Sequence, residues 1–181
     1  GVERLRALRL TEACGKLAFD TLLDEWAGLD RSVRLIDASM RREVSRDPLM
    51  DKLTALDGVG PVAAYVAVSE ACEFSRFPNA GEYVSYVGLA PVARNSGKSK
   101  AQRSSAGHGY AAECFKNGAA SVVSSHSAPL IAAPANAAEE GVNAIRVKLR
   151  ETFERGMEPK LRNAVMARTI AEEVWRLANA D

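Results

Sequence analysis

The stretch FDTLLDEWAGLDRSVRLIDASM, residues 19–40, decides the first part of the fold. Its apolar residues recur at alternating intervals of three and four, which is typical of an amphipathic or coiled-coil helix. This seam consists of Phe19, Leu22, Trp26, Leu29, Val33, Ile36 and Met40. Residues 1–55 hold ten basic and ten acidic side chains, so a balanced charged face surrounds one apolar stripe. Such a stripe packs against another helix, either within the same domain or in an intermolecular coiled coil.

The rest of the chain also predicts helices. Asp47-Pro48 and Gly60-Pro61 each combine a capping residue with proline at the first helical position, and Asn79 is a further N-cap. Residues 91–107 show no regular period and are expected to form a loop or an irregular hairpin. Longer helices are expected over residues 109–123, 138–155 and 159–179, the last with an apolar stripe of Met166, Ile170, Val174 and Leu177.

The composition favours closely packed helices. The chain has 181 residues, of which 47% are hydrophobic and only 6% aromatic, and alanine is abundant. Small side chains let helices approach closely, whereas a β-sandwich core is richer in large and β-branched residues. We therefore expect a mainly α fold, with a coiled-coil-like helical arm over residues 1–52 and a compact helical domain over residues 53–181.

Charge and apolar runs restrict the classes of function. The 24 basic and 23 acidic residues give a net charge of +1, so a nucleic-acid site must come from local clusters. No apolar run approaches the roughly 20 residues that span a bilayer, so no membrane partner is expected. Cys14, Cys72 and Cys114 lie far apart, which argues against a zinc site and suits a reducing compartment. The sequence therefore predicts a cytoplasmic location.

The segment Leu56-Asp57-Gly58-Val59-Gly60-Pro61-Val62-Ala63-Ala64 lies between two predicted helices and resembles a helix-hairpin-helix motif. Gly58 and Gly60 allow positive φ in a tight turn and let a ligand approach the backbone closely. The second helix presents free N–H groups and the positive end of its dipole to an anion. Such a hairpin can hold a DNA phosphate without reading sequence. The alternative is a glycine turn that only joins two helices.

Four basic residues and no acidic residue occur in the segment 94–105, RNSGKSKAQRSS. Arg94, Lys98, Lys100 and Arg103 give it a local charge of +4, which suits contacts with nucleic-acid phosphates. The same segment holds four serines, whose hydroxyl groups can attack phosphorus where fixed cations stabilise the developing charge. The alternative is an exposed loop whose charges are solvated.

A second basic cluster lies in residues 146–168, which contain seven basic and three acidic side chains. Its expected phosphate contacts are Lys160, Arg162 and Arg168. The sequence shows no His, Asp and Glu set with metal-ligand spacing, no Walker loop and no dinucleotide fingerprint. These patterns favour an anionic partner and no metal site in this chain.

Several short segments between Leu53 and Leu177 stand in a characteristic order and spacing. They are Leu56-Asp57-Gly58-Val59-Gly60-Pro61, Phe74-Ser75-Arg76-Phe77, Tyr86-Val87-Gly88-Leu89-Ala90-Pro91, Ser96-Gly97-Lys98, Ser104 with Gly107, Arg155-Gly156 and Val165-Met166-Ala167-Arg168. Together they resemble the C-terminal domain of the serine-plus-DEDD insertion-sequence transposases, a family that includes Piv-type DNA invertases and bridge-RNA-guided recombinases. The helical arm is similar to the coiled coil that precedes this domain in the family.

The resemblance implies a role for Ser104. In the family, the serine of a Ser-x-x-Gly element attacks a DNA phosphodiester and becomes covalently linked to it, and Ser104 with Gly107 matches that element. A separate RuvC-like domain supplies an acidic metal-binding tetrad, so Mg²⁺ is expected there and no cofactor in this chain. The family's usual basic residue, Asn and Arg are replaced here by Ser105, His108 and Ala112. A degenerate copy is therefore an open alternative.

The sequence thus predicts a DNA-binding and strand-exchange domain of an insertion-sequence transposase or site-specific recombinase, in a bacterial-type, nucleoid-associated setting. The expected nucleophile is Ser104. The expected DNA contacts are Gly58, Gly60, Arg94, Lys98, Lys100, Arg103, Ser105, Lys160, Arg162 and Arg168. Further copies of the chain are expected partners through the arm. A non-catalytic helix-hairpin-helix module and a purely helical oligomerisation module are the alternatives. The DNA target, the use of a guide RNA, the oligomeric state and what precedes Gly1 stay open.

Overall fold

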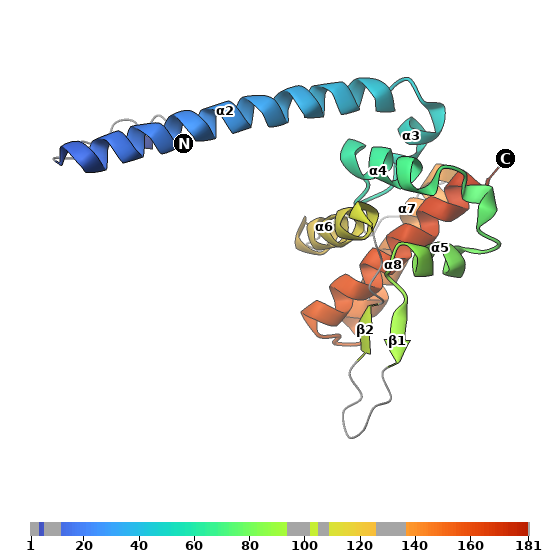
Figure 1. The fold of residues 1–181 in the computed structure, drawn as a ribbon. Helices are drawn as coiled ribbons and strands as arrows, with labels where there is room; N and C mark the ends of the chain where they lie inside the picture. Colours follow the sequence, from blue (N-terminus) through green and yellow to red (C-terminus); the bar gives the residue numbers. More distant parts are fainter. Residues whose placement is uncertain (1–3, 6–11, 94–101, 105–108, 126–136, 181) are drawn as a thin grey trace. The chain divides into compact units, whose positions relative to one another are not determined.

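A computed structural model describes residues 4–5, 12–93, 102–104, 109–125 and 137–180. The fold is mainly α, which confirms the predicted class, and the described residues add one pair of short strands (Figure 1). The helices are α2 (Ala13–Val44), α3 (Pro48–Leu53), α4 (Pro61–Ala71), α5 (Ala80–Tyr86), α6 (Tyr110–Ser125), α7 (Ala137–Glu154) and α8 (Pro159–Ala178), with a 3₁₀ turn, η1, at Phe74–Arg76. The strands are β1 (Pro91–Ala93) and β2 (Gln102–Ser104).

The chain divides into two compact units, which we call unit 1 (Gly1–Arg42) and unit 2 (Glu43–Asp181). The sequence placed the boundary between arm and domain after residue 52. In the structure, α3 packs against α4 and α8, so the whole of this short helix lies within unit 2.

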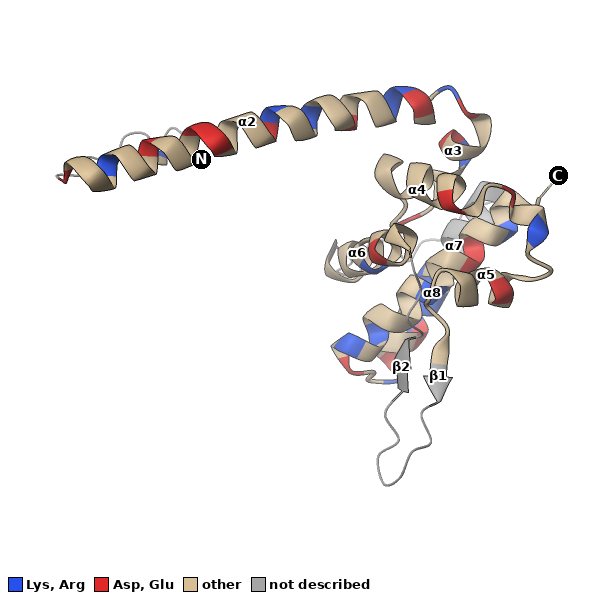
Figure 2. Ribbon diagram, in the orientation of Figure 1, with Lys and Arg blue, Asp and Glu red and all other residues tan. Residues whose placement is uncertain are grey.

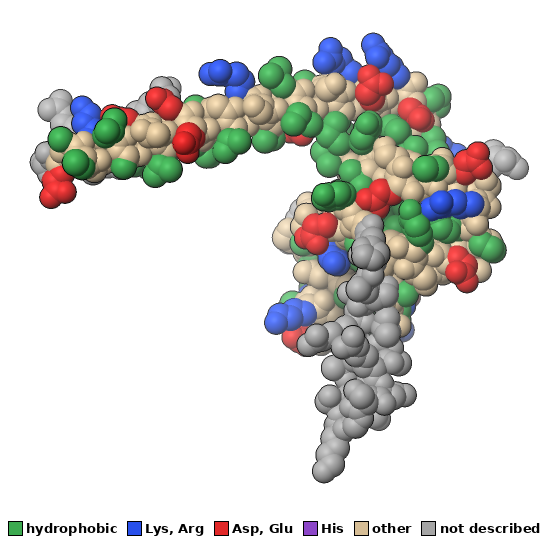
Figure 3. Space-filling view, viewed as in Figure 1, with side chains coloured by type: hydrophobic (Ala, Val, Ile, Leu, Met, Phe, Trp, Pro, Cys, Tyr) green, Lys and Arg blue, Asp and Glu red, His purple; other side chains and the backbone are tan. Residues whose placement is uncertain are grey.

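In unit 1, the helix α2 runs without a break through the predicted apolar seam. Five seam residues are between 50% and 66% exposed: Leu22, Trp26, Leu29, Val33 and Ile36. Both basic and acidic residues occur along the helix (Figure 2), and hydrophobic side chains lie open on its surface (Figure 3). The predicted amphipathic helix is therefore present, and its seam forms an exposed apolar stripe.

The helix starts in unit 2 follow their local capping residues. Asp47 accepts hydrogen bonds from the backbone N–H groups of Leu49 and Met50, and Pro48 follows it at the first helical position. Asn79 caps α5 by accepting from the N–H of Glu82 at 3.0 Å. Side-chain oxygens at these positions satisfy donors that the first turn leaves unpaired. These predicted starts are confirmed.

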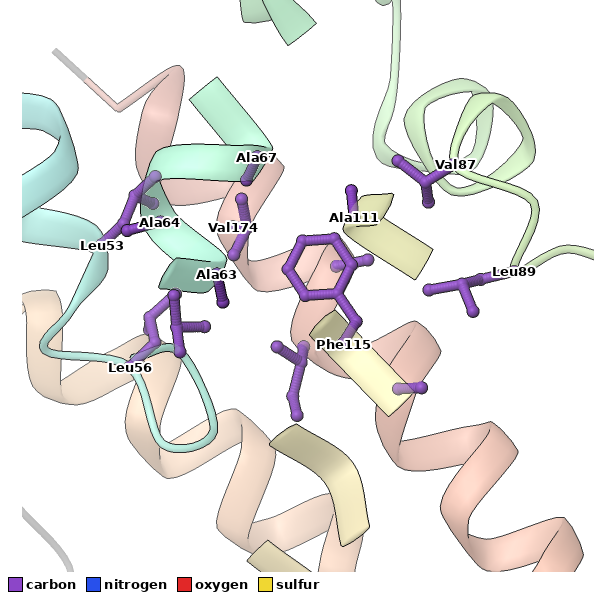
Figure 4. Close-up of a cluster of buried hydrophobic side chains, with 14 of the residues drawn as sticks. Leu53, Leu56, Ala63, Ala64, Ala67, Val87, Leu89, Ala111, Phe115 and Val174 are labelled. Atoms are coloured by element: carbon purple, nitrogen blue, oxygen red, sulfur yellow. The ribbon is translucent and has the colours of Figure 1, made fainter. Parts of the chain in front are cut away.

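The core of unit 2 is built around α8, which packs against α3, α5, α6 and α7. Its predicted stripe of Met166, Ile170, Val174 and Leu177 is buried. Small residues bring α4 close to its neighbours, since Ala64 and Ala67 are fully buried and Ala67 lies beside Val174 in Figure 4. Alanine in these positions leaves room for the large side chains of the opposite helices. The helical core therefore holds the loops that follow α3 and α5 in place.

Strands β1 and β2 pair antiparallel with Pro91 opposite Ser104 and Val92 opposite Arg103. The sequence left open whether this region forms a loop or an irregular hairpin, and the strand pairing corresponds to the hairpin.

Within the described part of the chain, no helix is both long enough and apolar enough to cross a membrane.

Candidate nucleic-acid interface

The glycine hairpin between α3 and α4 is a tight turn whose two glycines have different surroundings. Gly58 has a φ of +87°, a conformation that side chains disfavour. Val59 points into the core and is 3% exposed. Gly60 has extended backbone at the N-cap of α4, and a Cβ there would meet no atom within 4 Å. Gly58 is thus enclosed, whereas Gly60 faces open space.

Gly58 is enclosed because it lies directly against α6. A Cβ added at Gly118 would overlap the carbonyl oxygen of Gly58 and lie 3.0 Å from its carbonyl carbon. A Cβ added at Gly58 would lie 2.8 Å from Cδ1 of Ile170. The backbone of the hairpin is therefore fixed by contact between two glycines that are far apart in the sequence. Gly118 was not predicted from the sequence.

A cavity of about 620 Å³ lies beside the hairpin, and its lining includes Gly60, Asn117 and Ser121. The acidic residue of its lining, Asp57, accepts a hydrogen bond from Nε of Arg146 at 2.8 Å. This ion pair is mostly buried and offsets the negative charge next to the turn. The first turn of α4 contains no acidic residue, and its N–H groups have no partner within the helix. The hairpin therefore presents a surface that an anion can approach.

Cys114 also lines this cavity. Burial, and secondarily the negative charges of Glu70 and Glu113, raise the pKa of the Cys114 thiol. A raised thiol pKa keeps the sulfur protonated near neutral pH, which makes it a poor nucleophile. Cys114 therefore contributes to packing and to the cavity wall rather than to covalent chemistry.

The predicted nucleophile, Ser104, is the last residue of β2, and Arg103 precedes it on the same strand. Their backbones pair with Pro91 and Val92 of β1. The other predicted contacts of this basic segment, Arg94, Lys98, Lys100 and Ser105, lie outside the described residues. The structure therefore places the backbone of Ser104 and Arg103 beside β1.

The start of α6, shortly after β2, is held by Glu70 of α4. The Glu70 carboxylate accepts hydrogen bonds from the backbone N–H of Tyr110 at 2.7 Å and of Ala111 at 3.4 Å. Gly109 makes room for it, because a Cβ at that position would lie 2.5 Å from Glu70 Oε2. A carboxylate at a helix N-terminus satisfies free donors and interacts favourably with the helix dipole. Glu70 was not predicted, because it caps a helix that begins 40 residues later.

Lys160, Arg162 and Arg168 lie on α8, and Figure 2 shows basic residues on the N-terminal part of this helix. Arg162 is half-buried, because its guanidinium stacks on Phe153 at 3.7 Å and donates to the carbonyl of Met157 at 2.9 Å. Lys160 is exposed and Arg168 is half-buried. Arg162 therefore stabilises the turn between α7 and α8, while its expected DNA contact stays a prediction.

Arg76 is an exposed cation that was not predicted as a DNA contact from the sequence. Its guanidinium carbon lies 4.6 Å from the ring centroids of both Phe77 and Tyr86. Tyr86 is itself fixed, because its hydroxyl donates to the carbonyl of Glu70 at 2.9 Å. Stacking of this kind orients a guanidinium without neutralising it.

Comparison with known proteins adds one finding. Residues 50–135 match the family model described as the Transposase IS116/IS110/IS902 family. The matched residues begin in α3 and include the glycine hairpin, α4, α5, both strands and α6. No curated protein matches the chain. The family match supports a transposase function and suggests DNA as a partner.

Proposed function

We propose that unit 2 is a DNA-binding and strand-exchange domain of an insertion-sequence transposase or site-specific recombinase, with Ser104 as the nucleophile. The family match over residues 50–135 carries this proposal, because it includes the strand pair on which Ser104 lies. The architecture supports it, because described residues before β1 and after β2 are anchored in unit 2. Leu89, two residues before β1, is 8% exposed, and Glu70 holds the start of α6.

The reaction proposed for Ser104 is transesterification at a DNA phosphodiester. Its Oγ loses a proton and forms a bond to phosphorus, and the bond from phosphorus to one deoxyribose oxygen breaks. That oxygen leaves with a proton and can later attack the serine–phosphate linkage to join a new strand. The cationic side chains of Arg94, Lys98, Lys100 and Arg103 would stabilise the charge on the phosphate oxygens.

The proposed chemistry needs a group that this chain does not provide in its described part. Lysine and arginine cations stabilise phosphate charge but do not accept the serine proton at neutral pH. In the described residues, no cluster of three or more His, Cys, Asp or Glu side chains is placed to hold a metal ion. We propose that a RuvC-like domain supplies carboxylate-bound Mg²⁺, which activates the attacking oxygen or stabilises the leaving oxygen when bound.

The test is the formation of a covalent protein–DNA adduct. The chain would be mixed with a RuvC-like domain, Mg²⁺ and DNA, and adducts would be detected as a mobility shift that survives denaturation. We expect an adduct that disappears in Ser104→Ala, while DNA binding is retained. Ser105→Ala is the matched control and should keep the adduct. An adduct at Ser105 would preserve the mechanism and refute the assignment of Ser104. Adduct formation without metal would refute the proposal that a metal ion bound by the RuvC-like domain is needed for the reaction of Ser104.

The second proposed element is self-association through the apolar stripe of α2. Five large apolar side chains of the seam are exposed along one 32-residue helix. Coiled-coil seams bury such residues between two copies. Leu29→Glu should lower the apparent mass of the chain in sedimentation, because a charge in the seam cannot be desolvated. Ser32→Glu, on the same helix but outside the seam, should leave the mass unchanged. Equal masses for all three proteins would refute this interface.

A non-catalytic binding module is the alternative, and one observation favours it. Gly60 and the first turn of α4 face open space beside the 620 Å³ cavity, as a phosphate-binding hairpin requires. In addition, Ala112, where the family resemblance leads one to expect Arg, is 7% exposed and contributes to the core. DNA binding that is unchanged in Ser104→Ala, together with no adduct in the wild type under any metal condition, would favour this alternative.

A further inference from the structure

A second cavity, of about 300 Å³, lies close to the strand pair. It is formed by Leu89 from the segment before β1, Lys116 from α6, and Lys160, Asn163 and Ala164 from the start of α8. Its side chains therefore come from three parts of the chain that meet only in the folded unit. We call it the lysine pocket.

The lining of the lysine pocket is cationic. Its two ionisable residues, Lys116 and Lys160, carry the same charge. Two ammonium groups that face one cavity repel each other unless an anion lies between them. Lys116 also approaches Glu113 at 3.7 Å, but both side chains are about half exposed, so this ion pair is weak.

The N-terminus of α8 adds to this potential. The helix begins at Pro159, has no acidic residue in its first turn, and continues for 20 residues. Its dipole therefore presents positive charge near Lys160. Glu158 is the N-cap residue, but its side chain makes no capping hydrogen bond. Two cations and a helix terminus thus favour an anion at this place.

Asn163 supplies a polar group of a different kind. Its Oδ1 atom is buried and has no hydrogen-bond partner within the described residues. The same carboxamide carries an NH₂ group, which offers two donors. A tetrahedral oxyanion can accept hydrogen bonds from this amide and from both lysines. A half-buried amide next to two cations is therefore suited to a phosphate group.

The lysine pocket lies within a few nucleotides of Ser104. Leu89 precedes Pro91 by two residues, which span at most about 7 Å of chain. Pro91 pairs with Ser104 across the strands, where antiparallel Cα atoms lie about 5 Å apart. The Cα of Ser104 is therefore within about 12 Å of the Leu89 Cα.

We infer that Lys116, Lys160 and Asn163 form a binding site for one backbone phosphate of the DNA strand on which Ser104 acts. This inference rests on the proposed function of unit 2. Lys116 and Asn163 were not predicted from the sequence, because each is one residue on a helix and only the fold brings them together. The pocket fixes the position of the strand and does not read its bases.

The test compares charge variants of the whole chain for binding to a labelled DNA duplex by fluorescence anisotropy over a range of salt concentrations. The double variant Lys116→Gln with Lys160→Gln should bind roughly tenfold more weakly. Because both lysines hold the same phosphate, the slope of log K against log salt should fall by about 0.9 and not by twice that. The double variant Lys116→Arg with Lys160→Arg keeps the charge and should bind much more like the wild type.

Lys52→Gln is the control for loss of one positive charge. Lys52 donates to the carbonyl of Ala180, so it lies at the opposite end of α8 from Lys160. Asn163→Asp makes the same change in net charge inside the pocket without changing side-chain size. It should weaken DNA binding at least fivefold more than Lys52→Gln, with an unchanged circular dichroism spectrum confirming the fold.

The outcomes separate this inference from the proposed function. If the wild type binds DNA but the pocket variants bind like Lys52→Gln, the lysine pocket is refuted and the proposed function stands. If the wild type does not bind duplex DNA at low salt, both are refuted. If the pocket variants weaken binding of an RNA duplex and leave DNA binding unchanged, the assignment to DNA is refuted.

Discussion

Gly118→Ala should destabilise unit 2, although alanine is the better helix former. Gly118 lies inside α6, where replacing glycine by alanine normally stabilises by about 1 kcal/mol. Here the new methyl group would overlap the carbonyl oxygen of Gly58, which belongs to a turn with positive φ. Adding a carbon to a closely packed contact costs about 1–3 kcal/mol. We expect a cost near 3 kcal/mol here, because the atom that the methyl group meets belongs to the backbone and cannot rotate away as a side chain can.

The net expectation is a loss of about 2 kcal/mol in the free energy of unfolding. For a unit of this size, that corresponds to a melting temperature lower by about 4–8 °C. Urea denaturation followed by circular dichroism would measure the loss. Gly28→Ala in α2 is the matched control, because a Cβ there meets no atom within 4 Å. It should leave unit 2 unchanged and increase the helicity of unit 1.

The same variant reports on function. If the hairpin helps to hold DNA, Gly118→Ala should also weaken DNA binding, because the turn at Gly58 must move away from α6. Gly28→Ala should bind DNA like the wild type. A Gly118→Ala protein as stable as the wild type would refute the close contact between the two glycines. A destabilised variant with unchanged DNA affinity would show that the hairpin is structural only.

Three further predictions test other contacts. Glu70→Ala should cost about 1 kcal/mol of stability in urea denaturation, because α6 loses its N-terminal acceptor, and Glu70→Gln should cost less. Since burial raises the pKa of Cys114, its thiolate fraction at pH 8 is reduced, and mass spectrometry should show slower alkylation by iodoacetamide than at exposed Cys14. Burial also raises the pKa of Glu173, against the opposing effect of its bond to Arg176. Between the pKa of the unfolded chain and the raised pKa of the folded chain, Glu173 binds a proton more fully in the folded state, so its contribution to stability falls as pH rises from about 4.3. Glu173→Gln should accordingly raise the urea midpoint at pH 7 relative to the wild type more than at pH 4.

The parts of the fold that depend on neighbouring residues could be predicted from the sequence. Asp47 and Asn79 cap helices that start immediately after them, so the capping bond is a local property. The buried stripe of α8 repeats at helical spacing and needs no knowledge of its partners. By contrast, β1 and β2 have three residues each, which is too short for an alternating pattern to be recognised.

The contacts that shape the candidate site could not be predicted, because they join residues that are far apart in the chain. Glu70 caps α6 from another helix, and nothing around residue 70 indicates this. The lysine pocket combines Lys116 with Lys160, and neither residue alone differs from an ordinary exposed lysine. Arg162 was selected by its charge, but a sequence does not show that Phe153 lies beneath its guanidinium. A charge cluster therefore does not show which of its residues are held by contacts within the protein.

The net charge of +1 is compatible with a DNA-binding surface because several acidic residues of unit 2 are held by donors elsewhere. Asp57 pairs with Arg146 beside the hairpin, and Glu70 is directed at the first N–H groups of α6. Glu151 accepts from Lys148 on α7, and this bond lowers the pKa of its carboxyl group. Each of these carboxylates is held by a donor of the protein, so its charge is compensated locally. The lysine pocket has no acid in its lining, and its field therefore acts at short range even though the chain as a whole is nearly neutral. Steep salt dependence together with weak long-range steering is the behaviour that this arrangement predicts for DNA binding.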